Sequence, residues 1–85
     1  MKNSEFQLDL HGIKHEYARE ATIRFLEDKI ALNRKSRSTC NVGIVTGHST
    51  SMREIVIDVL DMYGFTYYVG GYLGMNPAVI TVEVD

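Results

Sequence analysis

Two short apolar stretches, each followed by a polar turn that contains glycine, constrain this chain more than any other feature. They cover residues 6–10 and 40–46, and a segment with helical periodicity, from about residue 15 to residue 33, lies between them. A strand, a helix and a second strand in this order predict two parallel strands joined by a right-handed crossover. The two polar turns should then lie at one edge of the sheet, beyond the carboxyl ends of the strands.

The second half of the chain has the pattern of one more helix. Its apolar residues recur at helical spacing: Met52, Ile55, Val56, Val59, Leu60 and Tyr63. Ser51 and Glu54 have the spacing of a capping box, which predicts that Ser51 is the N-cap. Gly64 is placed to end the helix in a left-handed conformation.

Two further strands are expected after this helix, because residues 65–69 and 78–84 are rich in aromatic and β-branched residues. The connection between them is too short to hold a crossover helix, so these strands should be antiparallel. The order β-α-β-α-β-β predicts an α/β fold, a two-layer sandwich with a four-stranded mixed sheet and two helices. The apolar run at 40–46 predicts a central strand that is covered on more than one side.

Composition favours a small soluble protein. The chain has 85 residues, which predicts a single domain, residues 1–85, with a flexible N-terminus at residues 1–5. It contains one cysteine, so no internal disulfide can form, and no apolar run approaches the length of a membrane span. We therefore expect a cytoplasmic protein with no membrane contact. The net charge of −2 gives no general attraction for nucleic acid, so any such contact must be local.

Several residues of the two turns should share one cleft: Asp9, His11, Thr46, Gly47 and His48. Imidazoles titrate near neutral pH, so His11 and His48 are candidates for a general base and a general acid that cleave RNA through its 2′-hydroxyl. Asp9 is a candidate for fixing the tautomer of one imidazole. The alternative is that His11 is a turn residue bonded to the backbone and that His48 is simply exposed.

The start of the second helix is a candidate phosphate site, because backbone N–H groups and the positive end of the helix dipole should face the cleft there. Gly47 would allow a ligand to approach the backbone closely. The side chains placed to contact a phosphate are Lys14, Ser49, Thr50, Ser51 and Arg53. The alternative is an ordinary strand-to-helix turn whose hydroxyls serve as caps.

A metal-binding regulator that uses His11, His15 and His48 is a further alternative. However, the first helix is expected to begin near His15, so the i,i+4 geometry of a helical histidine pair is doubtful for His11 and His15. We therefore assign no metal ligand. One aspartate and three histidines fit both acid–base chemistry and nuclease chemistry with a divalent magnesium or manganese ion.

At these residues the chain resembles the Smr (small MutS-related) domain family. Residues 8–12 read Leu-Asp-Leu-His-Gly and reproduce the family's LDLHG motif, and residues 44–48 stand in the place of its TGxG motif. The intervening helix also matches, with Ala18 and the pair Phe25-Leu26 at familiar spacings. The expected element order is that of the family, and the resemblance covers nearly the whole chain.

The resemblance implies a nicking endonuclease or ribonuclease domain that acts on DNA or RNA. Residues of both motifs are implicated in cleavage, which corresponds here to Asp9, His11, Gly12, Thr46 and Gly47. Residues 76–78 resemble an Asn-Pro-Gly sequence of some members but end in Ala78, and Asn76 is included among the candidate substrate-binding residues.

One departure from the family pattern is Ser49, which replaces the second glycine of TGxG and adds a β-carbon and a hydroxyl to the phosphate-facing loop. This change favours the alternative of a non-catalytic module that binds nucleic acid or a protein. Members usually carry fused modules that bring the domain to its target, so a protein partner that supplies targeting is a further alternative here. The sequence leaves the oligomeric state open.

Overall fold

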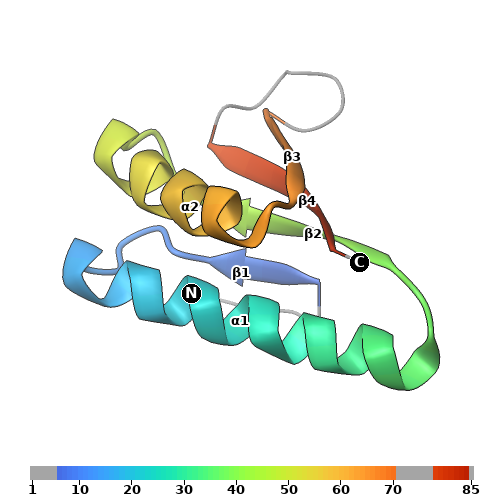
Figure 1. Cartoon of the computed structure of the whole chain (residues 1–85). Coiled ribbons are helices and arrows are strands. Elements are labelled where there is room, and N and C mark those ends of the chain that lie inside the picture. The colour runs from blue at the N-terminus through green and yellow to red at the C-terminus, as the bar shows by residue number, and fades with distance from the viewer. Residues whose placement is uncertain (1–5, 71–77, 85) are drawn as a thin grey trace.

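The computed structural model describes residues 6–70 and 78–84, so the expected N-terminal tail and Asn76 lie outside the described residues. Six elements follow one another in the predicted order (Figure 1). They are β1 (Gln7–Asp9), α1 (His15–Ser36), β2 (Cys40–Val45), α2 (Thr50–Tyr63), β3 (Thr66–Val69) and β4 (Val79–Val84).

The four strands form one mixed sheet in the order β1-β2-β4-β3. β1 pairs with β2 in parallel, with Leu8 opposite Ile44. β4 is antiparallel to both β2 and β3. The predicted parallel pair, the predicted antiparallel pair and the central place of β2 are therefore confirmed. Because β1 and β2 are parallel, the turns that follow them leave the sheet at the same edge.

Both helices lie on one face of the sheet (Figure 1). Burial alternates along β4, where Ile80, Val82 and Val84 are buried and the residues between them are half-buried. No described helix covers the other face, on which Val45 is half-buried. The expectation that β2 is covered on more than one side was therefore wrong, and its apolar character reflects its central position. The buried core under the helices comprises Leu8, Leu10, Ala18, Leu26, Val42, Ile44, Met52, Val56, Val59, Leu60, Ile80, Val82 and Val84.

Helix α1 continues one turn beyond the expected end at residue 33. Arg34 and Lys35 extend it because both are good helix formers and their charges are favourable near a helix C-terminus. Arg37 then ends the helix in a left-handed conformation, with φ of 55°. The buried Asn33 amide donates to the carbonyl of Val84 (3.0 Å) and ties this end of α1 to β4. Neither α1 nor α2 combines the length and apolar character needed to cross a membrane.

Two tyrosine hydroxyls connect α2 to its neighbours at the end away from the turns. Tyr63 donates to Glu27 of α1 (2.6 Å), and this hydrogen bond raises the pKa of Tyr63, with a smaller contribution from burial. Tyr67 donates to Asp61 (3.2 Å), and burial together with this carboxylate raises the pKa of Tyr67. Both phenols therefore keep their protons at neutral pH and serve to pack the elements.

Helix α2 begins two residues earlier than the capping box predicted. The N-cap is Ser49, whose hydroxyl accepts a hydrogen bond from the N–H of Met52 (3.1 Å). Ser51 lies inside the helix and is exposed, so its assignment as N-cap was wrong. The chain turns into the helix directly after Gly47-His48, which leaves Ser49 in the extended conformation that a cap requires. Gly64 ends the helix with φ of 77°, as predicted.

This assignment gives a direct stability test. Ser49→Ala should lower the free energy of unfolding by about 1 kcal/mol, because it removes the acceptor for an otherwise unpaired N–H. Ser51→Ala serves as the matched control and should change it by less than about 0.5 kcal/mol. Urea unfolding followed by circular dichroism measures both free energies of unfolding. A larger loss of stability in Ser51→Ala than in Ser49→Ala would show that Ser51 is the N-cap.

Candidate functional site

The turn after β1 is a tight β-turn that places His11 at the sheet edge. The N–H of Ile13 donates to the carbonyl of Leu10 (3.0 Å), and Gly12 has a φ of 83°. A positive φ at the third position of such a turn is the pattern of a type II turn and favours glycine. The Asp9 carboxylate accepts from the backbone N–H of His11 (2.9 Å), so it holds the turn from which the imidazole projects.

The turn after β2 is anchored to the start of β4. The carbonyl of Ala78 accepts from the N–H groups of Thr46 (2.7 Å) and Gly47 (3.2 Å). The Thr46 hydroxyl donates to the same carbonyl (3.2 Å) and to that of Gly47 (3.1 Å), and only 2% of Thr46 is exposed. The structure therefore places the Thr46 hydroxyl on the backbone of the turn, where it fixes the path of the chain into Gly47.

The two turns meet where the His11 imidazole lies against Gly47. A Cβ built on Gly47 would lie 3.2 Å from Cδ2 of His11, and the residue has a φ of 68°. The positive φ favours glycine because of the backbone, and a Cβ at this position would also push the His11 ring by a few tenths of an ångström. The hydrogen bonds between β1 and β2 continue to the residue before His11, because the N–H of Leu10 donates to the carbonyl of Val45 (2.8 Å).

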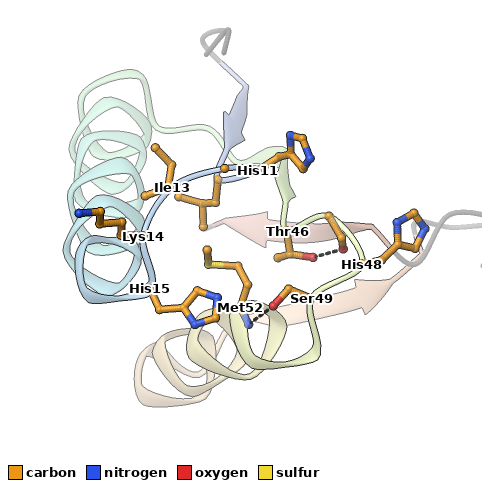
Figure 2. Close-up of a pocket in the computed structure, with 11 residues that line it drawn as sticks. His11, Ile13, Lys14, His15, Thr46, His48, Ser49 and Met52 are labelled. Carbon is orange, nitrogen blue, oxygen red and sulfur yellow. Dashed lines mark hydrogen bonds between the residues drawn. The ribbon is translucent and has the colours of Figure 1, made fainter.

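A hollow of about 630 Å³ lies between the turns and the starts of the two helices (Figure 2). Its floor is apolar and its rim is polar. The lining residues are Leu10, His11, Gly12, Ile13, Lys14, His15, Thr46, Gly47, His48, Ser49 and Met52. The structure thus brings together most of the residues that the sequence singled out.

Several predicted residues lie outside this lining. Asp9 supports His11 from beside the hollow. Thr50, Ser51 and Arg53 belong to the first turns of α2 but are not among the lining residues. Lys14 lines the hollow, yet Figure 2 shows its ammonium group directed away from Met52.

His15 lines the hollow although it had been considered only as a metal ligand. It is the first residue of α1, and its ring is directed toward Met52 and Ser49 (Figure 2). The sequence carried a usable signal, because a residue at the start of a helix that follows a parallel strand faces the same edge as the turns.

The charges around the hollow favour an anion. Its described lining contains Lys14 and three histidines and no carboxylate. Helix α1 starts at this edge with Lys14 as N-cap, and no side chain caps it. Helix α2 also starts here, so the positive ends of two helix dipoles face the same region.

The donor set does not form a metal site within residues 6–70 and 78–84, where no three His, Cys, Asp or Glu side chains come close enough to hold an ion. The set of His11, His15 and His48 is thereby not supported as a metal centre. Magnesium and manganese favour carboxylate oxygens, and the described lining has none. We therefore derive no catalytic step through a metal ion.

Comparison with solved structures decides the fold family. The solution structure of the SMR domain of NEDD4-binding protein 2 matches this chain with a TM-score of 0.73. The match covers 100% of this chain and 91% of the other, at 21% sequence identity. The chain has the SMR domain fold. No sequence-family model and no curated protein matches the chain. The resemblance suggested by the two turn motifs is confirmed for the SMR fold, over the full length.

Proposed function

We propose that this SMR domain binds DNA or RNA and cleaves its phosphodiester backbone. The observation that carries the proposal is the contact of His11 with Gly47 inside an anion-favouring hollow. It brings a group able to transfer a proton next to a backbone that a phosphate can approach closely. One fold can carry many different functions, so this site, and not the fold, supports the proposal.

The scissile phosphate would lie near Gly47, between the imidazoles of His11 and His48. The backbone at the start of α2 supplies donors, and Gly12 lies in the facing turn at a place where a Cβ would meet no atom within 4 Å. The cap leaves the Ser49 hydroxyl hydrogen free to donate, since its oxygen serves as the acceptor. Thr50, Ser51 and Arg53 would contact flanking nucleotides rather than the reacting phosphate.

With RNA, the chemistry needs two proton transfers. One imidazole removes the proton of the 2′-hydroxyl, and the 2′-oxygen attacks the adjacent phosphorus. The bond from phosphorus to the 5′-oxygen breaks, and a second imidazole, in its protonated form, gives a proton to that oxygen. The products are a 2′,3′-cyclic phosphate and a 5′-hydroxyl. His11 and His48 are the proposed pair, and the bond from the His11 N–H to Asp9 positions His11.

The test is a cleavage assay of the wild-type chain on end-labelled single-stranded RNA, linear duplex DNA and branched DNA, with magnesium and with chelator. Cutting of RNA in chelator, with cyclic phosphate ends, is the expected result. Cutting only with magnesium would refute the metal-free acid–base step but retain the nuclease. No cutting of any substrate would refute the nuclease.

A second candidate is a binding module without catalysis, and Ser49 favours it. Its hydroxyl oxygen caps α2 at the position where the family motif has glycine, and its Cβ occupies space beside the turn that glycine would leave open. The two candidates differ in turnover. Both predict binding that weakens as salt rises, but only the nuclease releases cut product.

A further inference from the structure

Three histidines line the hollow, but they lie on two different walls. His11 packs against Gly47 on the wall formed by the two turns, and His48 follows Gly47 directly. His15 lies on the opposite side, at the start of α1, and its ring is directed toward Met52 and Ser49 (Figure 2). The wall of His15 therefore has its own titratable group, and the proton transfers described above do not use it.

His15 is also the side chain best placed to bring positive charge to that wall. Lys14 precedes it, but its ammonium group is directed away from Met52 in Figure 2, whereas the His15 ring is directed toward Met52 and Ser49. No carboxylate is present among the described lining residues to neutralise an imidazolium. Met52, only 3% exposed, is part of the apolar floor of the hollow, while His15 is exposed.

We propose that His15 forms a second phosphate subsite, which holds the phosphate next to the scissile one. This inference rests on the proposed function, because successive phosphates of one strand would occupy the two walls. A hollow of about 630 Å³ has room for more than one phosphate group. His15 thus binds substrate without taking part in the proton transfers, and protonation of His15 makes this binding stronger as the pH falls.

The sign of the pH effect follows from the charges. A phosphate diester keeps its negative charge between pH 5.5 and 8, while an imidazole in this range changes from cation to neutral. His11 and His48 line the same hollow and contribute in the same direction, and Glu16 is the exposed carboxylate that follows His15 in the chain. The contribution of His15 to the pH dependence of binding is therefore measured by comparing wild type with His15 variants.

The experiment uses a fluorescent oligonucleotide with 2′-O-methyl groups, which binds but is not cleaved. His15→Ala should weaken binding about fivefold at pH 5.5 and much less at pH 8. His15→Lys should restore binding and reduce its pH dependence, because the ammonium stays charged. Lys14→Ala should weaken binding less than His15→Ala, and the matched control Glu16→Gln should stay within about twofold of wild type.

On a cleavable substrate, His15→Ala should raise KM and leave kcat within about twofold. A kcat loss as large as that of His11→Ala would instead place His15 in the chemistry and overturn the subsite. Equal binding by wild type and His15→Ala at pH 5.5 would also overturn it.

Inorganic phosphate followed by NMR of the histidine rings separates this inference from the proposed function. A shift of the His15 ring with phosphate, without binding of any oligonucleotide, would retain the anion subsite and refute the nucleic-acid function. No shift of the His15 ring with phosphate, together with no oligonucleotide binding, would refute both the anion subsite and the nucleic-acid function.

Discussion

Gly47→Ala is expected to lower cleavage about tenfold while the chain stays folded. The new Cβ would lie 3.2 Å from Cδ2 of His11, so the imidazole must move away from the turn. A shift of about 1 Å at a catalytic group can cost about a hundredfold, and a contact at this distance requires the ring to move by only a few tenths of an ångström, so the expected loss is about tenfold. Alanine would also have to adopt a φ of 68°, which should lower the free energy of unfolding by roughly 1–2 kcal/mol.

Gly64→Ala is the matched control, because it separates strain from displacement of His11. Gly64 has a φ of 77°, but a Cβ there would meet no atom within 4 Å. This variant should lose similar stability in urea unfolding and keep the cleavage rate of the wild type once folded. Equal cleavage by Gly47→Ala and wild type would contradict the placement of His11 in the reaction.

His11→Ala should reduce cleavage by a factor of about 10²–10⁴, the usual contribution of a positioned acid or base. The side chain is exposed, and the backbone N–H of His11 that bonds to Asp9 is kept in the variant, so the turn should persist. Binding of the uncleavable oligonucleotide should fall by no more than a few fold. A loss of binding as large as the loss of cleavage would make His11 a substrate ligand instead of a proton carrier.

Much of this fold was predictable because its signals are local and its topology follows general rules. Two strands with a helix between them predict a parallel pair. A parallel pair in turn places the two following turns, with His11 and Gly47, at the same edge of the sheet. The ends of the helices were less predictable. Arg37 adopts a left-handed conformation that arginine disfavours, and Ser49 and Ser51 are equally good caps by composition.

The directions of side chains within the site could not be read from the sequence. Lys14 and His15 are neighbours at one helix start, yet Figure 2 shows one directed away from the floor of the hollow and the other toward it. Thr46 follows a strand in the same way as His11, but its hydroxyl bonds to the carbonyl of Ala78, 32 residues later. Such contacts depend on long-range packing, which periodicity and spacing do not encode.

The most direct measurement is product formation from end-labelled single-stranded RNA by the wild-type chain and His11→Ala, run in parallel at equal folded concentration. The proposed function predicts cut product from the wild type and at most about one hundredth of it from the variant. Equal product from both, with both chains folded, would contradict a cleavage site at the meeting point of the two turns.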